Sequence, residues 1–317
     1  METLVFARTG THFATVGNAL EILRLSVEIG LLAVVMTPVI LTGGIDLSVG
    51  SLLGLCAVCF GKLWRDGGMA WPAAAVVTLG IGGIAGGLNA VLITRLRLPP
   101  LIVTLGSLSL FRGLAEALTR GVDNFTGFPP SFLMWGQGYF GGVIPAQLPL
   151  GVGVMIGVGL LVHATSFGRS LRAIGFSPEG ARHAGVPVGR QVTVVYLLSG
   201  GAAALAALVY VARVGQAKAD AGTGYELLAV TAVVLGGTSI FGGTGSVFGT
   251  VLGVATLAVL RNGLQLSDQP GELAGILTGV FLLLVLSGEA VLKKYSARRV
   301  ASGILPPSTV SSKPASS

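Results

Sequence analysis

The sequence predicts an all-α membrane protein, a polytopic transmembrane helical bundle. Of its 317 residues, 52% are hydrophobic and only 10% are charged, and the mean hydropathy is +0.83, whereas a soluble domain has roughly a quarter charged residues. One helix needs about 20 apolar residues to cross the hydrocarbon core, which leads us to expect about nine spans, within a range of eight to ten. The alternating pattern of a β-barrel is absent, so helices remain as the structure that satisfies its own backbone in lipid.

The apolar segments that we expect to span the membrane follow one another along most of the chain. They are residues 25–42, 48–63, 72–94, 101–121, 148–164, 193–212, 225–241, 245–262 and 271–287. The 50 glycines suit such a bundle, because small residues let helices pack closely in lipid. We divide the chain into an N-terminal segment (1–24), a transmembrane domain (25–290) that contains a polar loop (165–190), and a partly disordered tail (291–317).

Basic residues near the span ends predict the orientation, since Lys and Arg collect in cytoplasmic loops. Those that we place in the cytoplasm are Arg95, Arg97, Arg169, Arg172, Arg182, Arg190, Lys293, Lys294, Arg298 and Arg299. Counting back from the 165–190 loop through five spans leaves residues 1–24 outside, so we expect them to be periplasmic or the native start to lie upstream of Met1. The same rule explains the net charge of +7 without nucleic acid.

The 165–190 loop is the one long basic stretch between apolar segments, and it contains signals for a short helix. Ser177 is a favourable N-cap, Pro178 suits the first helical position, and Glu179 complements the positive end of the helix. Gly185 and Pro187 stop it. The resulting helix, 177–184, is too short to cross a membrane and suits a groove on a cytoplasmic partner; the alternative is an ordinary connecting loop.

A second motif, ILTGGIDLSVGSLLG, covers residues 40–54. Gly43 and Gly44 permit a break between helices, and Asp46, Ser48 and Ser51 follow at the start of the next helix. A break at membrane depth is tolerated only where it is buried in protein or lines a watery cavity. An ionisable residue there is a candidate for the transport pathway or its gate; the alternative is that Asp46 simply caps the helix.

Further polar residues lie at the ends of apolar spans. Asn89 and Asn262 are candidates for the pathway, with hydrogen bonding between helices as the alternative. Glu28, Glu226 and Glu272 are each expected to begin a span, where negative charge at a helix N-terminus is favourable.

The segment 235–253, LGGTSIFGGTGSVFGTVLG, resembles the first glycine motif. Both contain a double glycine and close on glycine, serine, two apolar residues and glycine. This similarity suggests an internal repeat of the kind found in many transporters, although chance similarity between glycine-rich segments is an alternative.

The sequence lacks the motifs of common catalytic sites. It contains no Walker A phosphate loop, no H-E-x-x-H and no G-x-S-x-G. His12, His163 and His183 are scattered, and Cys56 with Cys59 forms a single pair that we interpret as two small buried side chains. We therefore expect no catalytic residue, no cofactor and no metal site, and the chain is not predicted to be an enzyme.

Four segments together resemble the membrane permease subunits of bacterial carbohydrate ABC importers, the ribose, rhamnose and autoinducer-2 group. They are GGIDLSVGS, RLRLPPLIVTLGSLSLFRGLA, FGRSLRAIGFSPEGARHAGV and AGTGYELLAVTAVVLGGTSIFGGTGSVFGTVLG. The resemblance covers residues 14–286 and is strongest for rhamnose-type permeases, with autoinducer-2, ribose and xylose as other possible substrates. Relatives resemble a ten-helix form whose first helix has no counterpart in this sequence.

The resemblance implies a complex in the bacterial inner membrane. Its members would be a separate ABC ATPase, a second permease copy or paralogue, and a periplasmic sugar-binding protein, with alternating access driven by ATP. The short helix would be the coupling helix that docks on the ATPase, through Gly175, Ser177, Pro178, Glu179, Gly180, Ala181 and Arg182. The rival functions are a stand-alone secondary carrier, which would need paired acids in mid-membrane, and a channel, which would need no ATPase.

Overall fold

The structure is a computed structural model that describes residues 13–267 and 269–301. It is helical, as predicted, with two minor antiparallel strand pairs, β1 (Phe125–Thr126) with β4 (Gln216–Ala217) and β2 (Tyr139–Phe140) with β3 (Ile144–Pro145). The helices are α2 (Val16–Leu41), α3 (Val49–Arg65), α4 (Trp71–Thr94), α5 (Pro100–Leu118), α6 (Pro130–Gln137), α7 (Leu148–Ala164), α8 (Ser166–Phe176), α9 (Pro178–His183), α10 (Val188–Val214), α11 (Tyr225–Leu235), α12 (Val247–Leu266) and α13 (Gly271–Ala301).

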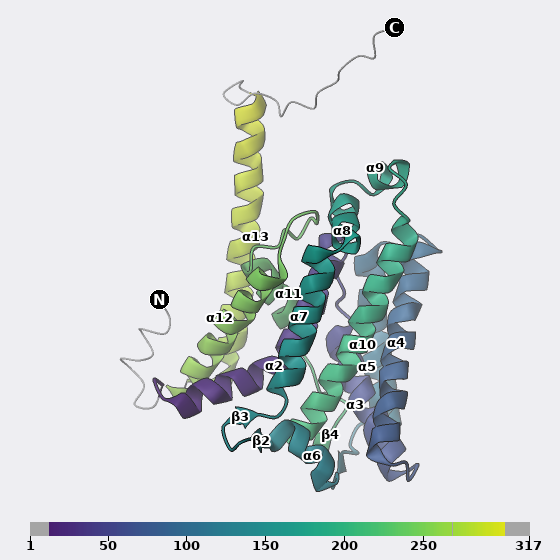
Figure 1. Cartoon of the computed structure of the whole chain (residues 1–317), viewed down its shortest axis with the longest axis vertical. Coiled ribbons are helices and arrows are strands. Elements are labelled where there is room, and N and C mark those ends of the chain that lie inside the picture. Colours follow the sequence, from purple (N-terminus) through teal and green to yellow (C-terminus); the bar gives the residue numbers. More distant parts are fainter. Residues whose placement is uncertain (1–12, 268, 302–317) are drawn as a thin grey trace.

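The long helices lie side by side between two ends of the bundle (Figure 1). One end carries α9 and the C-terminal end of α13, and we call it the α9 end; the opposite end carries α6 and the turn between α3 and α4. Arg95 caps α4 at its C-terminus. The basic segments predicted to share one side of the membrane therefore lie at the α9 end.

The number of spans is lower than predicted. Among the described residues, four helices are long and apolar enough to cross a membrane, namely α4, α5, α10 and α12. A fifth is added if α7 and α8, which meet at a bend of 69°, count as one span. Each predicted segment does contain a helix, but breaks in the chain shorten several of them: α3 and α7 have 17 residues each and α11 has 11.

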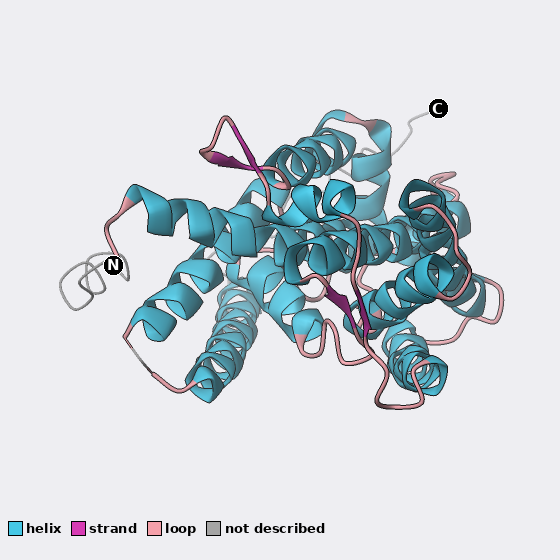
Figure 2. Cartoon of the chain, turned by 90° about the horizontal axis from the view of Figure 1, so that it is seen from below, coloured by secondary structure: helices cyan, strands magenta, loops and turns pink. Residues whose placement is uncertain are grey.

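Helix α2 forms the centre of the bundle. All its residues from Gly30 to Leu41 are buried, and it contacts α7, α8, α10, α11 and α12. A helix that is apolar on every side is typical of a protein core or of a membrane span, and the burial of Gly30 to Leu41 places this part of α2 in the core. The helices gather closely around one another in the view along the bundle (Figure 2). The polar groups of α2 and its neighbours must therefore find partners inside the protein.

Glycines bring α4 and α10 into backbone contact. A Cβ atom added to Gly82 would lie 2.5 Å from the carbonyl oxygen of Gly200, and one added to Gly200 would meet the backbone of Gly82 and Gly86. No larger side chain fits between these helices, which confirms close packing as one use of the abundant glycine.

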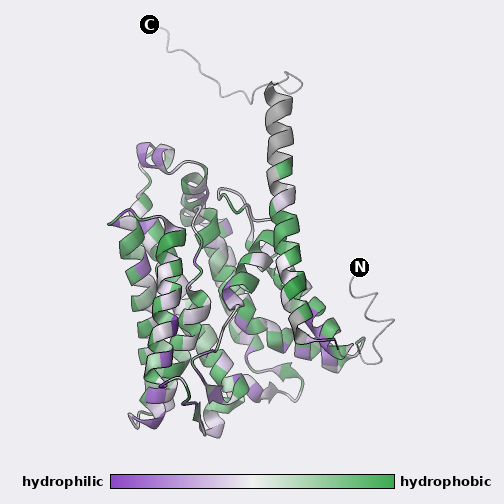
Figure 3. Cartoon of the chain, turned by 180° about the vertical axis from the view of Figure 1, so that it is seen from behind, coloured by the Kyte–Doolittle hydropathy of each residue, from purple (hydrophilic) through white to green (hydrophobic). Residues whose placement is uncertain are grey.

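The outer faces of the helices are apolar. Val76 and Ile84 of α4 are 69% and 76% exposed, and hydrophobic residues cover the middle of the bundle while hydrophilic ones gather at its two ends (Figure 3). In water such a surface would drive association. In a membrane it is the face that contacts lipid.

Both glycine motifs lie at breaks between helices, of which the break at Gly43 and Gly44 was predicted. Gly43 has φ 81° in the connection between α2 and α3, and Gly242 and Gly243 have φ 88° and 81° in the connection between α11 and α12. This left-handed conformation favours glycine, which lacks a Cβ. The predicted span 225–241 was too long, since α11 ends at Leu235 and the glycine-rich connection follows it.

Two helices, α2 and α13, extend far beyond their predicted spans. Helix α2 begins at Val16, not at residue 25, because Thr15 accepts a hydrogen bond from the Asn18 backbone and caps it. Helix α13 continues to Ala301, so the first part of the predicted tail is helical. The remainder of that tail, 302–317, and residues 1–12 lie outside the described residues.

The 165–190 segment holds two helices where the sequence predicted one. Helix α8 occupies Ser166–Phe176 and buries Gly168, Leu171 and Ile174 on one face. The prediction missed it because its polar, basic face dominates the composition of the segment. Helix α9 follows at once, and Ser177 is its N-cap, as predicted.

Candidate functional site

Helix α9 is a short helix that is capped at both ends and projects from the α9 end of the bundle; we call it the knob. The Ser177 hydroxyl accepts a hydrogen bond of 3.0 Å from the Gly180 backbone. At its other end Gly185 adopts φ 81°, and the Val186 amide donates to the Ala181 carbonyl over 2.9 Å. Such a C-cap satisfies carbonyls that the helix leaves free. The helix is therefore well defined although it has only six residues.

The knob has a buried side and an exposed side. Ala181 is 4% exposed and packs with Ile174 of α8 and Val188 of α10 in a small separate core. Glu179 and Arg182 are exposed. Of the predicted coupling residues, those from Ser177 to Arg182 build this knob, while Gly175 lies beneath it, against the backbone of Leu41 and Gly243.

A group of buried polar side chains surrounds the break between α2 and α3. One carboxylate oxygen of Asp46 accepts hydrogen bonds from the Ser48 backbone (3.0 Å) and hydroxyl (2.6 Å). The other accepts from the Ser199 hydroxyl of α10 (2.7 Å). Asp46 is 1% exposed, so these bonds replace water around a carboxylate that would otherwise be very costly to bury.

The group extends to α4 and α5. The Asn89 amide of α4 donates to the Ser48 hydroxyl over 3.0 Å, and the Ser107 hydroxyl of α5 donates to the Asn89 carbonyl oxygen over 2.5 Å. We call Asp46, Ser48, Asn89, Ser107 and Ser199 the Asp46 cluster. Every member is at most 4% exposed. The cluster thus joins four parts of the bundle and is closed to solvent in this conformation.

The sequence identified Asp46, Ser48 and Asn89 but not Ser107 or Ser199. These two serines lie within apolar helices, and only their position as single hydroxyls in a hydrophobic run marks them. Ser51, which was also predicted, donates instead to the Ser48 carbonyl of its own helix, over 2.9 Å.

Gly44 is fixed by a neighbouring aromatic residue. A Cβ atom added to it would lie 2.7 Å from the Tyr196 hydroxyl oxygen. Tyr196 is fully buried, and within the described residues its hydroxyl has no hydrogen-bond partner. The two glycines of the motif are therefore needed for different reasons. Gly43 adopts a left-handed backbone conformation, and Gly44 leaves room for the Tyr196 hydroxyl.

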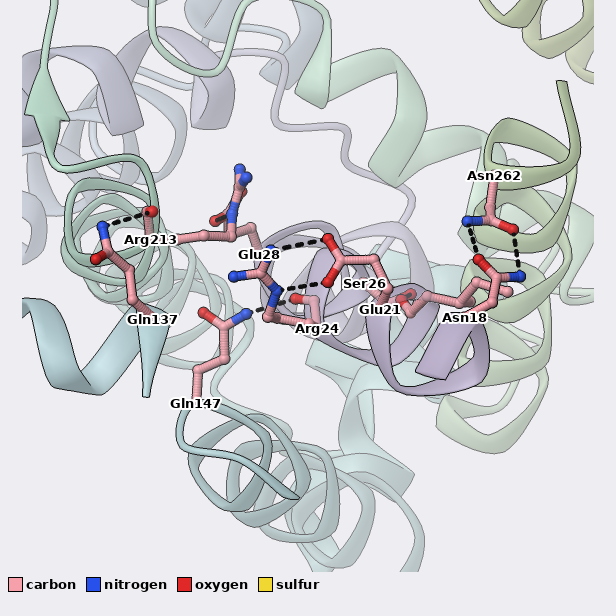
Figure 4. Close-up of polar contacts among 10 residues, drawn as sticks. Asn18, Glu21, Arg24, Ser26, Glu28, Gln137, Gln147, Arg213 and Asn262 are labelled. Atoms are coloured by element: carbon pink, nitrogen blue, oxygen red, sulfur yellow. Dashed lines mark hydrogen bonds and ion pairs between the residues drawn. The ribbon is translucent and has the colours of Figure 1, made fainter. Parts of the chain in front are cut away.

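A second polar group lies toward the opposite end of the bundle (Figure 4). Glu28 of α2 forms an ion pair with Arg213 of α10, with N···O distances of 2.6 and 3.0 Å, and the Tyr225 hydroxyl of α11 donates to the same carboxylate over 3.3 Å. The prediction that Glu28 begins a span was wrong. Glu28 lies within α2, where burial by neighbouring helices turns it into an ion-pair partner, whereas Glu226 lies in the first turn of α11, as expected.

The Glu28–Arg213 pair should be essential for stability. Glu28→Ala is expected to lower the free energy of unfolding by about 3 kcal/mol, because it leaves a partly buried guanidinium without its carboxylate. Denaturant titration in detergent measures this. Glu21→Ala is the matched control on the same helix, since Glu21 and its partner Arg24 are 36% and 22% exposed and such pairs contribute about 1 kcal/mol or less. Equal losses in the two variants would contradict the expectation.

Asn262 does not belong to the Asp46 cluster. Its side-chain amide and that of Asn18 exchange two hydrogen bonds of 2.9 and 2.8 Å between α12 and α2 (Figure 4). Asn262 therefore bonds between helices, and the residues predicted for a pathway do not form one site. Among the residues predicted for the pathway, Asn89 also bonds between helices, as the alternative expected.

A small cavity of about 200 Å³ lies beside this second polar group. Its polar lining is made of Arg213, Tyr225, Arg261, Asn262 and Gln265. These side chains offer several hydrogen-bond donors and acceptors to a small hydroxylated solute. In the part of the chain that the structure describes, no group of three or more His, Cys, Asp and Glu side chains could hold a metal ion.

Comparison with known proteins decides the family. A family model described as "Branched-chain amino acid transport system / permease component" matches residues 18–286, most of the chain. The chain belongs to this permease family. The permease is 38% identical over 283 residues to the autoinducer 2 import system permease protein LsrD of Salmonella typhimurium, covering 86% of this chain and 85% of the relative. LsrD of Escherichia coli K12 is 37% identical over 282 residues, with the same coverage. No solved structure matched the chain.

These relationships make the chain a subunit of a transport system and not an enzyme, and they place it in the bacterial inner membrane as a multi-pass protein. The resemblance to transport permeases is confirmed. The preference for rhamnose-type permeases is not supported, because the relatives named here are autoinducer 2 permeases.

Proposed function

We propose that this permease forms the membrane pathway of an ATP-driven importer for a small polyhydroxylated solute of the sugar and autoinducer-2 class. The observation that carries the proposal is α9, a rigid helix that presents Glu179 and Arg182 at one end of the bundle. The sequence has no phosphate loop of its own, so a separate ATPase supplies the energy. Helix α9 is the surface on which that ATPase docks.

The solute enters from the side opposite α9, where a periplasmic binding protein delivers it. The cavity beside Arg213, Tyr225 and Asn262 supports this direction, because its lining provides hydrogen bonds for hydroxyl groups. In this proposal the Asp46 cluster, which is buried in the bundle, is the closed part of the path toward the α9 end. Transport by alternating access requires this closed group to open when the ATPase pulls on α9.

The first test is purification of the tagged permease from its native membrane in a mild detergent, with every co-purifying protein identified by mass spectrometry. We expect an ATPase with a Walker A motif, a second permease copy or paralogue, and a periplasmic binding protein. Recovery of the chain alone, in a detergent that preserves other ABC importers, would contradict the proposal and favour a stand-alone carrier or channel.

The substrate is then identified with the purified complex in proteoliposomes. Autoinducer-2, L-rhamnose, D-ribose and D-xylose are supplied in turn with the co-purified binding protein, with ATP and without it. Uptake that needs ATP supports an importer and names its solute. Equal uptake with and without ATP would instead indicate a channel or an ion-driven carrier.

A further inference from the structure

Four glycines from three separate segments meet where α2, α8 and the α11–α12 connection come together, beside one another in Figure 1. We call Gly43, Gly175, Gly242 and Gly243 the glycine junction. A Cβ atom added to Gly242 would lie 2.8 Å from the backbone nitrogen of Gly43 and 3.1 Å from Cα of Gly175. The Gly243 amide donates a hydrogen bond of 3.0 Å to the Leu41 carbonyl. The three backbones therefore touch with no side chain between them.

Gly175 makes the closest of these contacts. A Cβ atom on it would meet the Leu41 carbonyl oxygen and the backbone nitrogen of Gly243, and would lie 2.9 Å from Cα of Gly243. All three are backbone atoms. Unlike the end of a flexible side chain, they cannot move aside by a change of rotamer. Any movement of α8 toward these atoms must therefore displace the end of α2 or the α11–α12 connection.

On one side the junction is joined to α9. Gly175 lies two residues before Ser177, whose amide donates to the Ala173 carbonyl of α8 over 3.0 Å. Ile174 of α8 packs on Ala181 of α9 in the small core beneath the knob. Helix α9 is thus attached to α8 both through the chain and through this small core.

On the other side the junction is joined to the Asp46 cluster. Gly43 is three residues before Asp46 in the chain, and Asp46 holds Ser199 of α10 through its carboxylate. Besides the bond from Gly243 to Leu41, the end of the α11–α12 connection has a second hydrogen bond: the Val247 amide at the start of α12 donates to Nε2 of His163 in α7 over 3.1 Å. The junction is therefore the place where α8, which packs against α9, touches both breaks in the bundle.

We propose that the glycine junction is the mechanical link that carries movement of α9 to the break between α2 and α3, with Gly175 as a positioning residue for coupling. This rests on the proposed function, in which an ATPase docks on α9. The physical basis is close packing: a dense interior transmits displacement from one element to the next, and a contact between backbones has no slack. Movement of α8 shifts Gly43 and thereby the donors around Asp46.

The variant that tests the link is Gly175→Ala in the purified complex with its ATPase. The added methyl group separates α8 from Leu41 and Gly243, so we expect ATP hydrolysis to continue while the amount of solute taken up per ATP hydrolysed falls about tenfold. The solute is whichever of autoinducer-2, L-rhamnose, D-ribose and D-xylose the wild-type complex takes up. The control is Gly157→Ala on the neighbouring α7, where an added Cβ has no atom within 4 Å; it should match the wild type.

Normal uptake per ATP in Gly175→Ala would overturn the inference, as would an equal loss in Gly157→Ala. The yield of ATPase that co-purifies with each variant shows that the fold and the docking surface are intact. If the Gly175→Ala chain does not assemble, the wild-type measurement below still decides the matter.

Hydrogen–deuterium exchange of the wild-type complex tests the link without any substitution and without a solute. Exchange is compared between nucleotide-free and ATP–vanadate-trapped complexes for peptides that cover 40–46, 177–184 and 236–246. We expect all three to change together, since the Gly243 amide is bonded to Leu41. A change confined to 177–184 would overturn the glycine junction while leaving the docking of the ATPase intact, whereas failure of any ATPase to bind would remove the proposed function itself.

Discussion

Asp46→Ala is expected to reduce solute uptake about tenfold or more while the complex still assembles. The substitution removes the acceptor of three hydrogen bonds, from the Ser48 amide, the Ser48 hydroxyl and the Ser199 hydroxyl. A buried donor left without a partner costs about 1–3 kcal/mol, and 1.36 kcal/mol corresponds to tenfold in a rate. The connection between the α2–α3 break and α10 is lost, since Asp46 is the group that joins them. ATP-dependent uptake in proteoliposomes measures the effect.

Two further variants make this test specific. Asp46→Asn keeps an acceptor oxygen for Ser48, and its amide can donate to the Ser199 hydroxyl, so we expect most of the uptake to be retained. Asp66→Ala is the control for loss of a carboxylate: Asp66 is exposed at the opposite end, where hydrogen bonds from Lys62 and Arg65 lower its pKa. Wild-type uptake in Asp46→Ala would leave Asp46 with no role beyond capping α3.

The double variant Glu179→Ala and Arg182→Ala is expected to uncouple ATP hydrolysis from uptake. Both side chains are exposed, so their loss leaves the fold unchanged. Charged groups at the rim of an interface fix its register, and their truncation weakens docking. We expect uptake, and the stimulation of ATP hydrolysis by solute, to fall about tenfold while basal ATP hydrolysis continues. The permease should still be inserted in the membrane at normal abundance.

Arg190→Ala is the matched control, because Arg190 is also an exposed cation at this end but lies on α10, outside the knob. Ala181→Leu is the complementary variant. Ala181 is buried against Ile174 and Val188, so a larger side chain displaces α9 from α8 and α10. We expect it to uncouple transport although every surface charge remains. Unaltered uptake in the double variant, or an equal loss in Arg190→Ala, would refute docking through Glu179 and Arg182.

The local features of the 165–190 segment were predictable in part. The N-cap at Ser177 and the stop at Gly185 were both predicted, because each depends on the chemistry of a few adjacent residues. Helix α8 was missed. Its polar face resembles a loop in composition, and its helical form is stabilised by burying Leu171 and Ile174 against elements that the sequence does not place nearby.

Some of the polar residues were likewise predictable from the sequence, whereas their hydrogen-bond partners were not. Asp46 was singled out because an acid beside a double glycine in an apolar run is unusual, but its partner Ser199 is 153 residues away. Glu28 was misassigned as a cap, since its partner Arg213 is 185 residues away and nothing in the sequence pairs them. The count of spans was too high because a run of apolar residues does not reveal how far the helix within it extends.

The sequence by itself determined the membrane class, the helical architecture, the break at Gly43 and Gly44, and the cap of α9. These follow from composition and from conformational preferences of single residues or short segments, which act without knowledge of the rest of the chain. Only the tertiary structure decided which polar groups meet, that Gly175 touches both breaks, and that Asn262 pairs with Asn18 away from Asp46. The physical reason is that such contacts depend on the depth and rotation of each helix, and these are set by the packing of all helices together.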